Sequence, residues 1–94
     1  MPVGVLRLHI GFHGNRSLKE KRGQLLPLIS KLRKQFNLSI VEMDMQDRWN
    51  ESIIACAGIS NSSDFLHKEF QNLIGYLNKH YPAIDLYTEN MEFF

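Results

Sequence analysis

The sequence predicts a single α+β domain in which a four-stranded antiparallel sheet carries two helices on one face. Two observations support this prediction. Four stretches alternate apolar and polar residues with a period of two, which is typical of strands, and two longer stretches repeat apolar residues at helical spacing. Their order is strand, helix, strand, strand, helix, strand. The 94 residues, 1–94, are enough for one domain and too few for two.

The first half of the chain contains one strand and one helix. The strand is expected over residues 3–12, where apolar and polar side chains alternate. Ser17 and Glu20 then form the S-x-x-E pattern of a capping box, and apolar residues at helical spacing predict a helix over about residues 18–36. Pro27 lies inside this helix and removes one of its hydrogen bonds. We therefore expect a kink at Pro27 rather than two helices.

The second half contains the other four elements. Residues 38–45 alternate again, and residues 50–60 form a near-continuous apolar run that is typical of a central strand. The short connection between these strands favours a hairpin. Helical spacing predicts the second helix over residues 65–80, Pro82 prevents its continuation, and a last strand follows over residues 84–93. Right-handed crossovers then give the ferredoxin-like βαββαβ arrangement.

This arrangement leaves one face of the sheet without helices. From the alternation, the expected residues on this face are Val5, Arg7, His9, Ile40, Glu42 and Asp44. Further members, according to the register, are expected among Ile54, Cys56, Tyr87 and Glu89. Apolar side chains lie among charges on such a face, which more often pairs with another surface than with water. We therefore expect a homodimer.

Charge is divided unequally along the chain. Residues 1–34 contain eight basic side chains and one acidic side chain, whereas residues 35–94 contain three basic and nine acidic side chains. Segregated charge can steer a polyanion or a complementary partner towards the protein. Alternatively, the basic and acidic halves pair with each other across the fold.

Several absences indicate the location of the protein. The N-terminal residues lack the pattern of a signal peptide, and no stretch contains the roughly 18 to 20 apolar residues of a membrane helix. The single cysteine, Cys56, lies in an apolar run and cannot form an internal disulfide. We expect a soluble cytoplasmic protein without a membrane partner.

Basic side chains surround the start of the first helix. Arg16, Lys19, Lys21 and Arg22 lie where the free amides and the dipole of the helix favour anions. We predict that they contact the phosphates of RNA without reading its sequence, or else form a solvated basic surface. Two features argue against nucleic acid: the pI is only about 7.9, and the outer sheet face lacks a pair of aromatic residues for stacking bases.

A second candidate surface surrounds the expected hairpin and consists of Arg7, His9, Glu42, Asp44 and Trp49. Glu42 and Asp44 are expected on one strand face, where they meet Arg7 or solvent. Trp49 is either a hydrophobic plug over the core or an exposed anchor for a partner. The histidines lack the companions that a zinc site needs, so we expect no metal and no cofactor.

The residues considered so far resemble a known family. Its pattern is carried by the strings VGVLRLHI (3–10), RSLKEKR (16–22) and RKQFNLSIVEMDMQDRWNESIIACAGISN (33–61). In this order they resemble the YlxP-like family, a bacterial domain of unknown function 503. The resemblance implies a ferredoxin-like fold and a bacterial cytosolic protein. Members are often encoded beside translation initiation and ribosome-binding factors, which implies work near RNA or the ribosome. The family has no established catalytic residues to carry over.

The sequence leaves three functions open. The first is a binding module that contacts RNA or a ribosomal particle through the start of the first helix. The second is a protein-interaction module that dimerises through its open sheet face without nucleic acid. The third is a phosphoryl-hydrolysing enzyme of acylphosphatase-like fold, in which Arg16 with Asn15 or Asn61 holds a phosphoryl group. The glycine-rich cradle of that enzyme is missing here.

Overall fold

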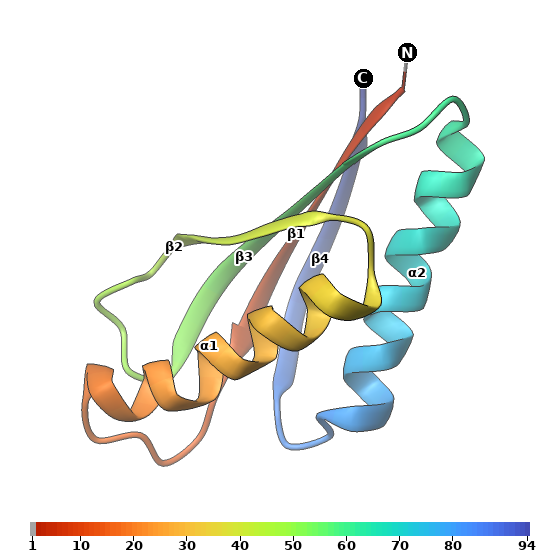
Figure 1. Ribbon diagram of the computed structural model, residues 1–94. Helices are drawn as coiled ribbons and strands as arrows, with labels where there is room; N and C mark the ends of the chain where they lie inside the picture. The colour runs from red at the N-terminus through yellow and green to blue at the C-terminus, as the bar shows by residue number, and fades with distance from the viewer. Residues whose placement is uncertain (1) are drawn as a thin grey trace.

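The chain forms four strands and two helices, which a computed structural model describes over residues 2–94 (Figure 1). In chain order they are β1 (Val3–Gly11), α1 (Leu18–Gln35), β2 (Ser39–Asp44), β3 (Glu51–Ile59), α2 (Ser63–His80) and β4 (Asp85–Phe93). Every predicted element is present, with bounds that differ by at most two residues from those expected.

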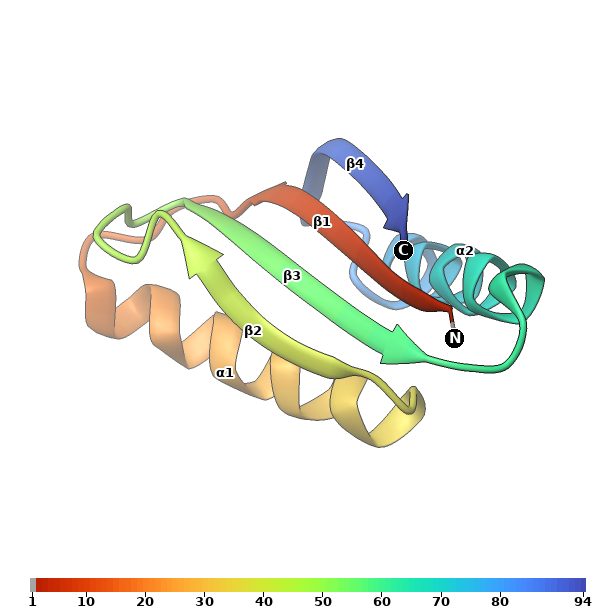
Figure 2. The same ribbon diagram turned by 90° about the horizontal axis from the view of Figure 1, so that it is seen from above.

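The strands form one antiparallel sheet in the order β2-β3-β1-β4. β1 and β2 are therefore parallel to each other with β3 between them, and β3 and β4 are parallel with β1 between them. Both helices lie on one face of the sheet, and the opposite face has no helix (Figure 2). The predicted ferredoxin-like α+β fold is confirmed.

The core lies between the sheet and the two helices. Strand residues alternate between the two faces, so every second residue of β1 and β3 points towards the helices. The helices complete the core with one apolar stripe each. The buried members are Leu6, Leu8 and Ile10 of β1, Ile54 and Cys56 of β3, Leu25, Leu28, Ile29 and Leu32 of α1, and Leu66, Phe70, Leu73 and Leu77 of α2.

Helix α1 is capped at its start and passes through Pro27 as one helix. Ser17 Oγ accepts a hydrogen bond from the amide of Glu20 at 3.1 Å, as the capping box predicts. The Glu20 carboxylate accepts from the amide of Arg16 instead of that of Ser17. Gly23 and Pro27 are both exposed, so water can satisfy the Gly23 carbonyl that the proline leaves without a donor.

The face of the sheet without helices, which we call the open sheet face, differs from the prediction on β2, β3 and β4. On β4, Tyr87 packs against His9 of this face, but Glu89 pairs with Leu8, whose side chain lies on the helix-covered face. Ile40 and Cys56 pair with each other on the helix-covered face, where Ile54 also lies, so placing these three residues on the open sheet face was wrong. A shift of one residue moves the whole set to the other side of a strand. The residues of β2 and β3 that occupy the open sheet face are Ser39, Val41, Asp44, Glu51, Ile53, Ala55, Ala57 and Ile59.

A bulge in β2 separates two acidic residues that were expected on one face. Glu42 pairs with Ile54 on the helix-covered face, whereas Asp44 pairs with Ile53 on the open sheet face. The extra residue of a bulge reverses the alternation that follows it. The prediction that Glu42 lies on the open sheet face is therefore wrong.

Candidate functional site

The predicted basic cluster at the start of α1 divides into exposed and buried members. Arg16, Lys19 and Arg22 are exposed, but Lys21 is only 1% exposed. Lys21 Nζ lies 2.9 Å from Glu42 Oε2 and donates to the Met45 carbonyl at 2.7 Å. Lys21 is therefore unavailable to a phosphate, and we remove it from the expected anion-binding set.

The Lys21–Glu42 ion pair joins α1 to β2 inside the protein. Glu42 Oε2 also accepts a hydrogen bond from Ser52 Oγ at 2.7 Å, so this carboxylate has two donors. Sequence reasoning missed the pair because residues 21 and 42 are far apart along the chain. One signal was present, since Lys21 falls on the same helical stripe as the buried Leu25 and Leu28.

The exposed cations of α1 are not neutralised by the acidic half of the chain. Glu20, the single acid of the helix, is engaged by the Arg16 amide, and Arg33 donates to the Ile40 carbonyl at the edge of the sheet. The other exposed cations form no salt bridge with any carboxylate of residues 2–94. We call this set the basic helix surface; its members are Arg16, Lys19, Arg22, Lys31 and Lys34.

The other predicted surface is only partly assembled. Arg7 and His9 lie on the open sheet face, and each is paired with a carboxylate of another strand. Arg7 Nη1 lies 3.2 Å from Glu92 Oε1, and His9 Nε2 lies 3.0 Å from Glu51 Oε1. Arg7 therefore meets neither of the two acids of β2.

Two further members of that surface, Asp44 and Trp49, lie at the hairpin between β2 and β3, whereas Glu42 is turned towards the helices. Asp44 is exposed, and its carboxylate accepts from the Met45 amide at 2.7 Å. Met45 adopts a positive φ of 63°, which closes the turn. Trp49 is 50% exposed, which favours an exposed anchor over a plug in the core.

The residues considered for phosphoryl binding do not come together. Asn15 is buried, and its Nδ2 donates to Gln24 Oε1 at 2.7 Å and to the Trp49 carbonyl at 3.0 Å. Asn61 follows the far end of β3, which separates it from Arg16 by about 30 Å at roughly 3.3 Å per strand residue. The pairing of Arg16 with Asn61 is therefore wrong, and the Asn15 side chain is already engaged.

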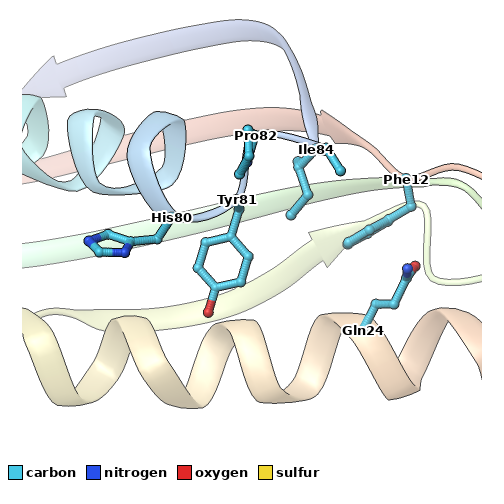
Figure 3. Close-up of a pocket in the computed structure, with 7 residues that line it drawn as sticks. Phe12, Gln24, His80, Tyr81, Pro82 and Ile84 are labelled. Carbon is cyan, nitrogen blue, oxygen red and sulfur yellow. The ribbon is translucent and has the colours of Figure 1, made fainter.

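A hollow of about 310 Å³ opens between α1 and the turn that joins α2 to β4 (Figure 3). Sequence reasoning missed it because its walls come from three distant segments. The only local signal was the gathering of ring-bearing residues around Pro82. The walls are formed by Phe12, Gln24, His80, Tyr81, Pro82, Ala83 and Ile84.

A second hollow, of about 500 Å³, lies between α1 and the edge strand β2. Arg22 and Arg33 line it together with the exposed apolar residues Leu26 and Val41. The guanidinium groups of Arg22 and Arg33 therefore lie beside the edge of the sheet.

Two further features, a metal-ligating cluster and a helix able to span a membrane, are absent from residues 2–94. Across residues 2–94, no group of three or more His, Cys, Asp and Glu side chains is placed to hold a metal ion. In the same part of the chain, neither helix is long and apolar enough to cross a membrane.

The fold and the exposed cations define a small ferredoxin-like domain with a basic surface on one helix. Residues 3–90 match the model of a family described as a protein of unknown function, DUF503. A curated relative, the uncharacterised protein YlxP of Bacillus subtilis (strain 168), is 32% identical over 78 residues, which cover 83% of this chain and 84% of YlxP. The chain belongs to the DUF503 family, and the resemblance to YlxP-like proteins is confirmed.

Proposed function

We propose that this protein is a binding module that contacts the phosphate backbone of RNA, free or within a ribosomal particle, through the basic helix surface. One observation carries the proposal: the exposed cations from Arg16 to Lys34 have no carboxylate partner within residues 2–94. The alternative, in which the acidic half of the chain pairs with the basic half, is realised at the buried Lys21 and at Arg7 of β1, but at no exposed cation between Arg16 and Lys34.

The geometry of α1 suits a backbone contact rather than a reading of bases. The distance along the helix axis from Lys19 to Lys34 is about 22 Å at roughly 1.5 Å per residue, so the cations can follow several phosphates. The Glu20 carboxylate lies at the start of the helix, bonded to the Arg16 amide, where its negative charge disfavours a phosphate at the free amides of the helix end. The phosphate contacts that we propose are therefore made by side chains.

The test is the salt dependence of binding to a fluorescent fragment of ribosomal RNA, measured by anisotropy. We expect Lys19→Glu with Arg22→Glu to weaken binding and to flatten the plot of log affinity against log salt by about 0.7 to 0.9 for each lost contact. Lys21 stays unchanged in this variant because it is buried.

A matched control reverses the same number of charges on the other helix. Lys68 and Lys79 are exposed on α2. The variant Lys68→Glu with Lys79→Glu should keep most of the affinity and the slope. The proposal fails if the α1 variant binds as the unchanged protein does, or if both variants lose the same affinity.

A second candidate function is self-association through the open sheet face. Val41 and Ile59 on this face are 46% and 64% exposed, while Arg7 and His9 are already paired with carboxylates of the same chain. Two copies can therefore meet there without burying an unpaired Arg7 or His9. Sedimentation that shifts from monomer to dimer with rising concentration would support it, and a monomer at every concentration would contradict it.

A further inference from the structure

We propose that the hollow between α1 and the turn from α2 to β4 binds a planar ring, the base of a nucleotide whose phosphates meet the basic helix surface. The proposal rests on the proposed RNA contact and deepens it, because it names the part of the ligand that enters the protein.

The walls of the hollow suit a flat, partly apolar ligand. The rings of Phe12 and Tyr81 and the side chain of Ile84 lie around the space above α1, and Gln24 reaches up from the helix (Figure 3). Aromatic side chains are the usual stacking partners of unpaired bases. The volume of about 310 Å³ is at the lower end of the range of small-molecule sites, roughly 300 to 1,000 Å³.

The Gln24 side chain makes one hydrogen bond and leaves its amide donor free. Its Oε1 accepts from Asn15 Nδ2 at 2.7 Å, and Asn15 is itself anchored by the Trp49 carbonyl at 3.0 Å. Gln24 Nε2 has no hydrogen-bond partner within residues 2–94. This amide can donate to a carbonyl oxygen or a ring nitrogen at the edge of a base.

The Tyr81 hydroxyl is a second polar group beside the aromatic walls of the hollow. Burial, and then the nearby Tyr76, raises the pKa of the Tyr81 hydroxyl above its ordinary value. The hydroxyl therefore remains protonated at neutral pH and can donate as well as accept.

A cation of the basic helix surface lies on the same side of α1 as the hollow, although it is not one of the residues that line the hollow. Lys31 follows Gln24 by seven residues, which places it two turns further along the same flank of α1. Long helical side chains lean towards the N-terminus, in this case towards Gln24. A nucleotide with its base in the hollow therefore has an unpaired ammonium group near its phosphate.

The experiment compares an eight-nucleotide single-stranded oligoadenylate with an abasic ribose-phosphate oligomer of the same length. We expect the intact oligomer to bind the protein about tenfold more tightly, which is the usual effect of stacking one base. If the abasic oligomer binds equally well, the hollow takes no base and this inference is overturned. The Lys19 and Arg22 reversal would still report separately on the RNA contact.

Two variants test whether the preference for the intact oligomer over the abasic one arises in the hollow. Gln24→Glu keeps the acceptor for Asn15 but removes the free donor, and Tyr81→Leu keeps an apolar wall but removes the ring. Each should reduce the tenfold preference by at least threefold, and thermal melting should show that both remain folded. Gln35→Glu, which adds the same charge at an exposed position of α1, should preserve the preference. If both variants keep it in full, the base binds elsewhere and the inference fails.

Adenosine monophosphate distinguishes a hollow that binds a base of RNA from one that binds the base of a free nucleotide. If neither oligomer binds but the mononucleotide shifts the amide resonances of Gln24 and Ala83, the hollow is a nucleotide site and the RNA function is wrong. If none of the three ligands shifts these resonances, the hollow takes no base and this inference is wrong, while the Lys19 and Arg22 reversal decides the RNA contact.

Discussion

At the scale of single residues, the Lys21–Glu42 pair links the start of α1 to the edge strand of the sheet. Lys21 is 1% exposed, and its ammonium group contacts only Glu42 and the Met45 carbonyl. We predict that Lys21→Met lowers the free energy of unfolding by about 3 kcal/mol, because it leaves a carboxylate without its cation. Urea denaturation at pH 7 measures this loss.

Two further variants separate the ion pair from the general effect of removing a lysine. Lys19→Met, at an exposed position of α1, should change the unfolding free energy by less than about 0.5 kcal/mol. Replacing both partners, Lys21→Met with Glu42→Met, should be more stable than the single variant. A single variant as stable as the unchanged protein would show that the pair does not hold α1 to β2.

Cys56 should make stability depend on pH in the alkaline range. Burial raises the pKa of its thiol from 9.0 to about 12. Above about pH 9 the unfolded chain releases this proton while the folded chain keeps it, so folding stability falls as pH rises. The expected loss is about 1.4 kcal/mol per pH unit until the folded protein also ionises.

The measurement compares the unchanged protein with Cys56→Ala in urea at pH 8, 10 and 11, because lysines and tyrosines also titrate in this range. The difference in unfolding free energy between the two proteins should shift in favour of the alanine variant as pH rises. A difference that is constant over this range would mean that the thiol ionises equally in both states.

The residue scale is also where sequence reasoning about the site was weakest. The start of a helix is usually exposed, and this holds for Arg16, Lys19 and Arg22. Lys21 is instead paired with Glu42, and no local sequence pattern shows that this strand residue faces the helix. The free amide donor of Gln24 could not be predicted from the sequence either, because its orientation depends on Asn15 and on the backbone of the hairpin. Both features arise only when distant segments meet.

At the scale of the elements, most of the fold was predictable because local patterns agree with the final structure. Ser17 caps α1 as its spacing with Glu20 indicates, and the apolar stripes of both helices face the core. The register of β2 was not predictable, since Ile40 and Val41 are equally apolar and alternation alone cannot choose between faces. The bulge after Glu42 then reverses the pattern again.

The helices contain glycines that the structure does not require. A Cβ atom added at Gly23 or Gly75 would meet nothing within 4 Å, and both residues lie inside helices. We predict that Gly23→Ala and Gly75→Ala each raise the unfolding free energy by about 1 kcal/mol, because alanine loses less backbone freedom on folding. For a domain of this size, the melting temperature should rise by about 4 to 8 °C.

Gly14 is the matched control, because it also has open space around it but lies at a φ of +78°. Gly14→Ala should lower the melting temperature, since the left-handed conformation costs an L-residue about 1 to 2 kcal/mol. If all three substitutions have the same sign, backbone conformation is not what distinguishes these sites.

At the scale of the whole molecule, the fold separates two candidate surfaces by one layer of protein. The basic helix surface lies on the helical layer, and the open sheet face lies on the other side of the sheet (Figure 2). A polyanion on the helices therefore leaves the sheet face free. The charge division seen along the chain supports the same arrangement, because β2 and β4 carry acids while α1 carries most of the cations.

This separation predicts that self-association and RNA binding respond to different substitutions. Val41→Glu with Ile59→Glu places two carboxylates on the open sheet face at positions that are exposed in one chain, so folding should be unaffected. We expect this variant to sediment as a monomer at concentrations where the unchanged protein is a dimer. It should keep the salt dependence of its RNA binding, because the basic helix surface is intact.

The matched control for that variant is Leu26→Glu with Phe65→Glu, which changes two equally exposed apolar residues of the helical layer. Leu26 and Phe65 are 59% and 58% exposed, so the added charge and the lost apolar surface are similar. This variant should remain dimeric, and its RNA binding should weaken because Leu26 lies beside Arg22 on α1. If it dissociates the dimer while the sheet-face variant does not, copies of the chain meet through their helices, and the surface that we assign to RNA is the one that self-association would cover.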